Sequence, residues 1–356
     1  MNSNDQINRI VVRGTNWLGD AVMSVPALRE LSRIFPDAEI VLHTKQTVVG
    51  VFDDADFIDR TLAFEKQRSK IRQTVDQADL LGEEEFDLAI LLPNSFESAL
   101  TSKLARIPRR IGYNKDLRGL LLTDPIPVPE WKKKRHEAFY YLNLIAEAER
   151  RYLGRSTVGL TVPDGSLTMS DERREAARER LRSAGADLSR PIIAIGAGST
   201  NSTAKRWGAG RFAELNDRLG SEFAAQTLLM GASSEADVTG EVLARSTHEP
   251  IDLTGKTSVS EAAAILSIAD LLVSNDMGLA HLAPAVGTRT AVIFGPTDPV
   301  TTRPFSDLAV VIRHNVDCAP CMLRECPIDH RCMDRISVDH VLEVCRDMLT
   351  VEQPNE

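Results

Sequence analysis

The sequence contains no run of about 18 consecutive apolar residues, the length that a membrane-spanning helix requires. Its N-terminus, MNSNDQINRIVVRG, lacks the hydrophobic core of a secretory signal, so we expect the protein to stay in the cytoplasm. An excess of positive charge is also missing, because 42 Lys and Arg residues stand against 51 Asp and Glu residues. The formal net charge is −9, whereas a nucleic-acid-binding protein usually carries an excess of Lys and Arg. We therefore do not expect nucleic acid to be a partner.

Cysteine is sparse and unevenly placed. Only five cysteines occur, and four of them crowd one short segment as Cys318, Cys321, Cys326 and Cys332. This is not the evenly spread framework of a secreted disulfide protein, so reduced thiols are the default expectation. Four thiols so close together also fit a zinc site, but the gap between the pairs is shorter than the roughly 12 to 20 residues of common zinc modules. We prefer buried thiols or an adventitious disulfide to structural zinc.

Two common phosphate-binding motifs are missing. No GxxxxGK[ST] string is present, so the chain has no P-loop. A DxD motif that binds a metal and a diphosphate would have to follow a strand. The one DxD-like string, Asp54-Ala55-Asp56, does not, and we expect a solvated helix end there.

The first half of the chain alternates between strand and helix patterns. At 356 residues the chain is long enough for two domains. Apolar runs predict strands, and residues with helical spacing between them include 21–35 and 136–154. The expected strands are 9–13, 39–44, 86–92 and 109–113. Such alternation predicts a parallel sheet covered by helices on both faces.

The second half repeats this alternation after a segment rich in Gly, Pro and Ser at 154–170. The expected strands are 191–199, 227–231, 251–255, 271–273 and 289–294. We place the boundary inside that segment and divide the chain into domains 1–165 and 166–356. The fold class is therefore α/β with two parallel-sheet domains.

Polar residues follow the expected strands, where ligands bind in open α/β sheets. In the loop 14–20, glycines allow close approach of a ligand, and Asp20 follows Gly19 where a helix begins. A cap and a catalytic base are both possible roles for Asp20. Gly198, Ser199 and Thr200 form a second such loop, an anion site if Lys205 turns toward it rather than into solvent.

Two further strand ends carry acids. Glu235 follows 227–231 and could bind ribose hydroxyls. Asp276, Gly278 and His281 follow 271–273 at a helix start, whose N–H groups and dipole suit a diphosphate. The ordinary alternative is that Asp276 caps the helix and His281 is a core histidine.

Several segments together resemble glycosyltransferase family nine. They are RGTNWLGDAVMSVPALRELSRIFPDAEIVLHTK, the segment Ala204-Lys205-Arg206-Trp207, LTGKTSVSEAAAILSIADLLVSNDMGLAHLAPAVGTRTAVIFGPTDP and CAPCMLRECPIDHRCM. The resemblance extends over nearly the whole chain. It implies the GT-B architecture, in which two Rossmann-like domains face across a cleft, with the acceptor bound by the N-terminal and the nucleotide sugar by the C-terminal domain.

The resemblance also implies roles for individual residues. The aspartate that ends the N-terminal glycine loop, here Asp20, is the family's proposed general base, and Lys205 corresponds to a ligand of the donor diphosphate. Asp276, Gly278 and His281 correspond to the donor-binding loop and helix, and Glu235 corresponds to a glutamate at the donor ribose. Some relatives have Ser or Thr after the aspartate. Met277 stands there in this chain, so we expect no side-chain hydroxyl contact to phosphate.

The reaction that the resemblance implies is transfer of L-glycero-D-manno-heptose from ADP-heptose to an inner-core heptose of lipopolysaccharide, with inversion and with neither metal nor cofactor. Because the acceptor is anchored in lipid A, peripheral contact with the cytoplasmic face of the inner membrane is expected, and the basic run 131–135 is a candidate for it. A solvated surface is the alternative for this run. Another GT-B enzyme on a nucleotide sugar, such as an epimerase, or a non-catalytic nucleotide-binding protein also remains open.

Overall fold

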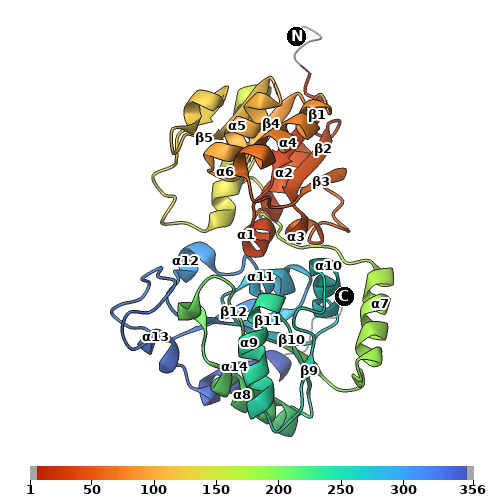
Figure 1. Cartoon of the computed structure of the whole chain (residues 1–356), viewed down its shortest axis with the longest axis vertical. Coiled ribbons are helices and arrows are strands. Elements are labelled where there is room, and N and C mark those ends of the chain that lie inside the picture. Colours follow the sequence, from red (N-terminus) through yellow and green to blue (C-terminus); the bar gives the residue numbers. More distant parts are fainter. Residues whose placement is uncertain (1–5, 351–356) are drawn as a thin grey trace. The chain divides into compact units, whose positions relative to one another are not determined.

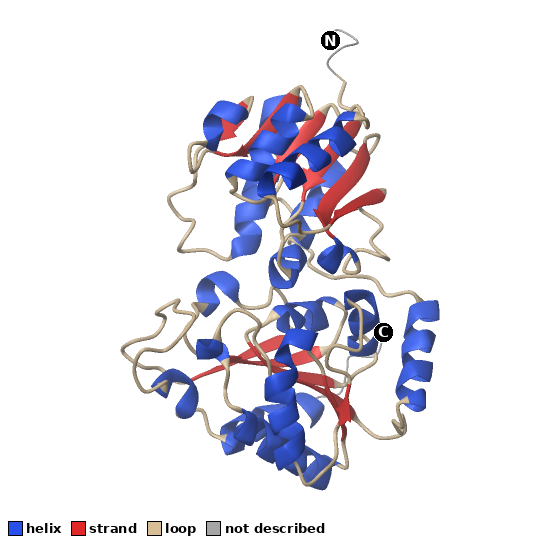
Figure 2. Ribbon diagram, viewed as in Figure 1, coloured by secondary structure: helices blue, strands red, loops and turns tan. Residues whose placement is uncertain are grey.

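A computed structural model describes residues 6–350 of the chain. It divides into two compact units, Met1–Gly165 and Ser166–Glu356. Each unit has its own parallel sheet with helices on both faces (Figures 1 and 2). Within residues 6–350, no helix is long and apolar enough to cross a membrane.

The N-terminal unit is built on a six-stranded sheet in the order β3-β2-β1-β4-β5-β6. The strands are β1 Arg9–Arg13, β2 Glu39–Lys45, β3 Arg60–Phe64, β4 Leu88–Leu91, β5 Arg109–Tyr113 and β6 Asp124–Ile126. The helices are α1 Leu18–Met23, α2 Val25–Ile34, α3 Gln46–Val49, α4 Lys70–Gly82, α5 Phe96–Leu104 and α6 Glu137–Leu153. This strand order reverses direction between β1 and β4, which is the switch point of a Rossmann fold.

Both faces of this sheet are buried because successive residues of a strand point to opposite sides. Val11, Val41 and Ala89 share one face with buried residues of α4 and α5. Ile10 and Val12 on the other face are fully buried, and α2 and α6 pack against each other. The middle residues of β1, β2 and β4 are therefore apolar, as in parallel strands that are covered on both sides.

The C-terminal unit repeats this plan in the order β12-β11-β10-β7-β8-β9, with all neighbours parallel. Its strands are β7 Ile192–Gly196, β8 Gln226–Leu229, β9 Ile251–Asp252, β10 Leu271–Asn275, β11 Arg289–Phe294 and β12 Ala309–Arg313. Its helices are α7 Asp171–Ser183, α8 Ala209–Phe223, α9 Ala236–Arg245, α10 Val259–Leu266, α11 Gly278–Ala285, α12 Pro299–Thr302, α13 Arg331–Asp334 and α14 Val338–Thr350. The switch point lies between β7 and β10.

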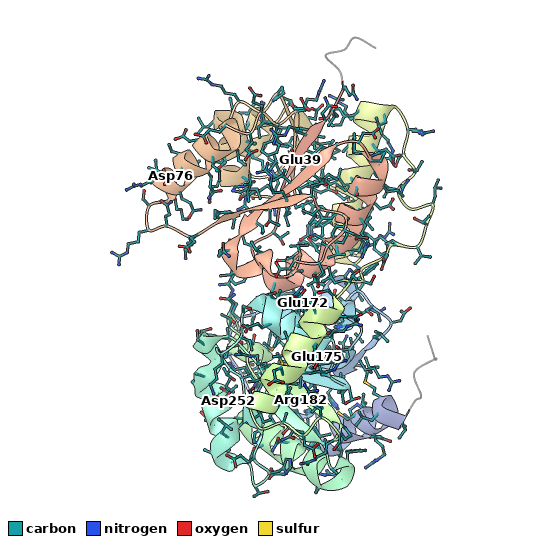
Figure 3. All side chains as sticks on the ribbon, turned by 90° about the vertical axis from the view of Figure 1, so that its right-hand side faces the viewer. Glu39, Asp76, Glu172, Glu175, Arg182 and Asp252 are labelled. Carbon is teal, nitrogen blue, oxygen red and sulfur yellow. The ribbon has the colours of Figure 1, made fainter. Side chains whose placement is uncertain are left out.

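The largest buried side chain of this unit fixes one side of its core. Trp207 is 1% exposed, packs edge-on against Phe212 of α8 with ring centroids 5.1 Å apart, and donates its indole N–H to the Ile336 carbonyl. By contrast, α7 buries only Ala177 and Leu181. Its outer side carries charges, including Glu175 and Arg182, whose side chains pair at 3.1 Å (Figure 3).

The structure corrects three expectations from the sequence. The helix expected over 21–35 is two helices, because the chain turns at Ser24, the C-cap of α1 and the N-cap of α2, and Pro26 then starts a new first turn. The edge strands β3, β6 and β12 were not predicted. β3 and β6 contain only short apolar runs, whereas β12 has an apolar run at 309–312 that is partly exposed. Asp54 and Asp56 lie in turns between α3 and β3, not at a helix end.

Candidate functional site

Polar residues of the C-terminal unit gather at the switch point of its sheet. The loops after β7 and β10 start from neighbouring parallel strands, with Gly196 paired to Ser274 in register. Gly198 to Thr200 follow β7, and Asp276 and Met277 follow β10 and lead directly into α11. Ligands of open α/β sheets bind at this place.

Asn275, the last residue of β10, ties three segments together. Its side chain is fully buried. Its amide donates to the carbonyls of Ala197 at 2.7 Å and Gly198 at 3.2 Å, while its Oδ1 accepts the backbone N–H of Trp207 at 3.0 Å. Because buried amides are costly unless they are fully bonded, this side chain fixes the loop after β7 and the 204–207 segment against β10.

Asp276 holds Lys205 at the same strand end. Lys205 Nζ lies 2.7 Å from Asp276 Oδ2, which also accepts the Thr297 hydroxyl at 2.7 Å. His281 Nε2 lies 3.9 Å from Asp276 Oδ1. The carboxylate side chain is 5% exposed and the lysine side chain 26%. Lys205 therefore does not extend into solvent, and its ammonium group lies beside Asp276, two residues before α11 begins.

The start of α11 gives this place a set of backbone donors. Its N-cap is Met277, without a side-chain cap bond, so Asp276 is not the cap. The first turn of a helix leaves N–H groups without intrahelical partners and carries the positive end of the dipole. A methyl group on Gly196 would lie 2.7 Å from Ser274 Cβ and 3.0 Å from Met277 Sδ, so the strand end allows only glycine there.

Glu235 closes the loops after β7 and β8. Its carboxylate accepts the Ala232 N–H at 2.9 Å and the Thr200 hydroxyl at 3.2 Å, and the residue is 1% exposed. Burial raises the pKa of this carboxyl group. A Cβ added to Gly198 would lie 2.3 Å from Glu235 Cδ, and one added to Gly231 would lie 2.8 Å from Glu235 Oε2. Glu235 thus holds both glycine loops in place.

The cysteine-rich segment supports the loop that carries Lys205. The Arg324 carbonyl accepts the Ala204 N–H and the Ser202 hydroxyl, both at 3.0 Å, and His330 Nε2 lies 2.6 Å from the Ala204 carbonyl. Cys318 and Cys321 are exposed and Cys332 is buried; all are free thiols, so the expectation of buried thiols holds for only part of the set. Among residues 6–350, no group of three or more His, Cys, Asp and Glu side chains is arranged to hold a metal ion.

Asp20 occupies the corresponding place in the N-terminal unit. It lies in the first turn of α1, whose N-cap is Trp17, so Asp20 is not the cap either. The residue is half-buried, with Gly19 beside it. Burial raises the pKa of the Tyr141 hydroxyl of α6, and the charge of Asp20 raises it further, which places Asp20 near α6.

The loop after β4 holds polar residues that were not predicted. The Asn94 amide donates to the Tyr140 hydroxyl at 3.1 Å, and Tyr140 stacks on Tyr113 with centroids 4.0 Å apart. Arg118, fully buried, donates to the Tyr113 carbonyl at 2.7 Å and to the Pro93 carbonyl. The PNS sequence just after the apolar strand β4 is the signal in the sequence for Asn94.

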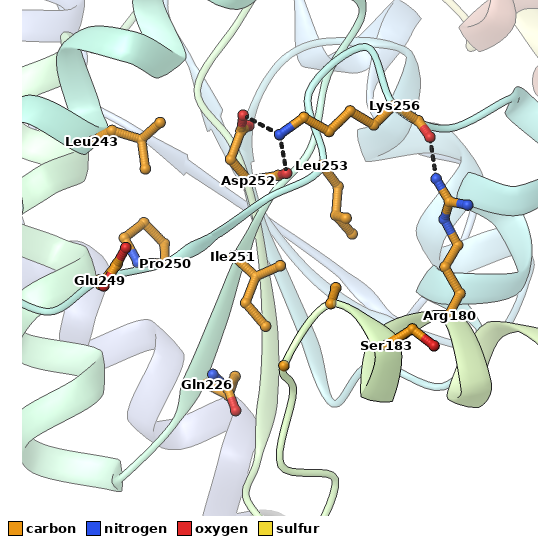
Figure 4. Close-up of a pocket in the computed structure, with 12 residues that line it drawn as sticks. Arg180, Ser183, Gln226, Leu243, Glu249, Pro250, Ile251, Asp252, Leu253 and Lys256 are labelled. Carbon is orange, nitrogen blue, oxygen red and sulfur yellow. Dashed lines mark hydrogen bonds and ion pairs between the residues drawn. The ribbon is translucent and has the colours of Figure 1, made fainter.

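A separate cavity of about 810 Å³ lies beside the edge strand β9 (Figure 4). Its cations are already bonded. Lys256 Nζ donates to the Asp252 carbonyl at 2.8 Å and lies 2.9 Å from its carboxylate, and Arg180 donates to the Lys256 carbonyl. Because it lies beside the edge strand, this cavity is distinct from the switch-point site.

The sequence matches glycosyltransferase family 9 (heptosyltransferase) over residues 77–331, which is more than half of the chain. The chain belongs to glycosyltransferase family 9. The protein is therefore a glycosyltransferase of the heptosyltransferase family, and the resemblance noted in the sequence is confirmed.

Individual relatives agree with this assignment. Lipopolysaccharide heptosyltransferase 2 of Escherichia coli (strain K12) is 28% identical over 86% of this chain and 88% of its own. Lipooligosaccharide heptosyltransferase 2 of Campylobacter jejuni is 24% identical over 96% of this chain and 98% of its own. The solved structure of E. coli ADP-heptose lps heptosyltransferase II superposes with a TM-score of 0.81 and 25% identity, covering 96% of this chain and 98% of that one. The predicted GT-B fold class is thus confirmed.

The family 9 residues singled out in the sequence fall into two groups. The structure brings nine of them to one edge of the C-terminal sheet: Gly198, Ser199, Thr200, Lys205, Glu235, Asp276, Met277, Gly278 and His281. Gly19 and Asp20 lie in the N-terminal unit. Asn275, Thr297 and the Arg324 carbonyl complete the C-terminal set and were not predicted.

The contact between Gly198 and Glu235 yields a testable prediction. We expect Gly198→Ala to lower the free energy of unfolding of the C-terminal unit by about 1–3 kcal/mol, because the new methyl group overlaps the buried carboxylate. In a Glu235→Ala background most of this cost should disappear, as measured by urea unfolding in a double-mutant cycle.

Gly240→Ala is the matched control, since nothing lies within 4 Å of the methyl group added there. An equal cost of Gly198→Ala in both backgrounds would show that Glu235 does not set the requirement for glycine.

Proposed function

We propose that this family 9 enzyme transfers L-glycero-D-manno-heptose from ADP-heptose to the inner-core heptose of lipopolysaccharide, with inversion and without a divalent metal. The observation that carries the proposal is the pairing of Lys205 with Asp276 beside the start of α11. A lysine and backbone N–H groups converging at the switch point match the charge and shape of a diphosphate. The names of the heptosyltransferase 2 relatives support the choice of sugar and acceptor.

In the proposed reaction, an acceptor hydroxyl oxygen forms a bond to the anomeric carbon from the face opposite ADP. The bond between that carbon and the β-phosphate oxygen breaks, and its electron pair leaves with ADP. Asp20 accepts the hydroxyl proton as the new bond forms. Lys205 and the N–H groups at Gly278 stabilise the charge that develops on ADP, the task that a metal ion performs elsewhere. His281 and Thr297 position Asp276, which in turn positions Lys205.

Glu235 has a different role in this proposal from the one the sequence suggested. The residue is 1% exposed, and its carboxylate already accepts two hydrogen bonds. A ribose hydroxyl reaches it only if the Thr200 hydroxyl turns away. We therefore propose that Glu235 shapes the two glycine loops and exchanges Thr200 for the ribose when the donor binds.

The general-base assignment is tested by Asp20→Asn, which keeps the shape of the side chain but removes its basicity. We expect turnover with ADP-heptose and a heptosylated core acceptor to fall by about 10²- to 10⁴-fold, while ADP affinity measured by calorimetry stays unchanged. The exposed Asp37, changed to Asn, serves as the control and should keep full turnover. Near-normal turnover of Asp20→Asn would remove the assignment. Free heptose or an epimer as the product of the wild type would indicate a different GT-B enzyme.

The role of Lys205 is tested by Lys205→Met. Loss of one preorganised donor is expected to lower kcat by about 10²- to 10³-fold and to weaken ADP binding. In the double variant Lys205→Met/Asp276→Asn no buried carboxylate is left unpaired. If ADP binding and kcat stay low in this variant, the loss reflects the missing lysine contact and not misfolding. Arg218→Met, which breaks a surface pair with Glu222, is the control. Transfer should also survive excess EDTA, and its loss on chelation would contradict a metal-independent reaction.

Peripheral membrane contact is proposed for the run 131–135, which the structure divides. Lys132 pairs with Glu137, and Arg135 lies 5.1 Å from the Trp131 ring centroid, whereas Lys133 and Lys134 are exposed. At about 1 kcal/mol per lysine, changing both exposed lysines to Ser should weaken binding to anionic vesicles roughly 30-fold. The same change at Lys103 and Lys115 is the control. Equal vesicle binding by both double variants would dismiss the membrane role.

A further inference from the structure

Cations without carboxylate partners gather at the strand ends of the N-terminal sheet. Arg13 ends β1, Lys45 ends β2 beside it, and Lys66 follows β3. Within residues 6–350, none of the three forms an ion pair with a carboxylate. This group of cations differs from the donor site, where the Asp276 carboxylate forms an ion pair with Lys205.

Arg13 is the buried member of this group. It is 7% exposed, and it donates to the Gly14 carbonyl at 2.7 Å and to Asn16 Oδ1 at 3.2 Å. Its guanidinium also lies 4.3 Å from the ring centroid of Phe64. Burial lowers its pKa to about 10, so the group stays charged at neutral pH. Its hydrogen-bond partners are all neutral, and Glu97 is the acid whose charge opposes it, so a positive field is left at the strand ends.

Lys45 extends this field toward an exposed aromatic ring. Its Nζ lies 5.7 Å from the ring centroid of Trp17, which is 54% exposed. Burial lowers the pKa of Lys45, and the charges of Lys66 and Arg13 lower it further. Glu97 is the acid that opposes them, and its carboxylate is shared with the Gln73 amide at 2.7 Å. Lys45, beside the exposed indole, is thus acted on by the charges of two cations and one carboxylate.

Trp17 also lies next to the proposed base. It is the N-cap of α1, and its carbonyl accepts the Ala21 N–H at 2.9 Å, so Asp20 lies in the helical turn that Trp17 begins. Residues three apart in a helix lie on the same side. Trp17 and Asp20 are therefore attached to the chain within one helical turn of each other.

We infer that Trp17 and Lys45 form an acceptor subsite that binds an anionic sugar, with the pyranose ring against the indole and a phosphate or carboxylate group against Lys45, in the field of Arg13 and Lys66. The inference rests on the proposed function for the identity of the acceptor. Trp17 and Lys45 bind and position the acceptor, whereas Asp20 alone accepts the proton of its hydroxyl group.

The test uses the full-length protein and a de-acylated, heptosylated inner-core oligosaccharide. Lys45→Met keeps most of the side chain but not its charge, and Trp17→Ala removes the ring. Each variant is expected to raise the acceptor KM by about 10-fold or more, with donor KM and kcat within about twofold of the wild type. Trp17→Phe should restore most of the affinity. Lys103→Met, in the last turn of α5, is the matched control.

Fluorescence titration gives a second readout that does not need turnover. Trp207 is buried, but Trp131 is partly exposed, so the titration is done in a Trp131→Phe background, in which quenching by the oligosaccharide should come from Trp17 and vanish in Trp17→Phe. Two treated oligosaccharides, one without phosphate and one with reduced carboxyl groups, identify the anion. If Lys45→Met and the wild type bind one of them with equal affinity, that treatment has removed the group that Lys45 recognises.

Unchanged acceptor KM and unchanged quenching in Lys45→Met and Trp17→Ala would overturn the subsite. The subsite would also be overturned if each treatment weakened the binding of Lys45→Met and of the wild type by the same factor. A wild type that binds the oligosaccharide through Trp17 but transfers no heptose would keep the subsite and refute the proposed function, so the two failures are distinguishable.

Discussion

The ion pair between Asp276 and Lys205 is the contact on which the donor site depends. A carboxylate that is 5% exposed costs several kcal/mol of desolvation unless a cation and hydrogen-bond donors surround it. The ion pair therefore holds Lys205 at the end of β10. The neighbouring Asn275 binds the same segment, 204–207, by accepting the Trp207 N–H. The carbonyl of Arg324 holds the segment from its other side. The cysteine-rich segment thereby gains a structural role that does not depend on its thiols.

The two units use one topology for opposite electrostatic tasks. In each, polar residues occupy the strand ends beside the switch point. In the C-terminal unit the cation is paired, so a nucleotide diphosphate meets a fixed lysine and a helix start. In the N-terminal unit Arg13 and Lys45 contact neutral groups, and Glu97 is the acid whose charge opposes them, so net positive charge remains for an anionic substrate. The proposed division of the substrates between the units follows from this difference.

Most of the fold could be predicted from the sequence because the central strands are buried on both faces and read as apolar runs. β1 and β5 have the predicted ends. The edge strands β3 and β6 were missed because their apolar runs are short, and β12 was missed although 309–312 is an apolar run. The site could be predicted where a residue directly follows a strand, as Asp276 does. Asn275 was missed because it belongs to the strand itself, and Thr297 because its partner is distant in sequence. Arg118 donates to residues at least five positions away, which no local pattern indicates.

The central claim is that a diphosphate binds where β10 meets α11. The most direct measurement is an experimental structure of the protein with ADP. The account predicts a β-phosphate oxygen within about 3.2 Å of both Lys205 Nζ and a backbone N–H of the first turn of α11, with Asp276 still beside the lysine. ADP bound instead in the cavity at β9, against Arg180 and Lys256, would contradict it.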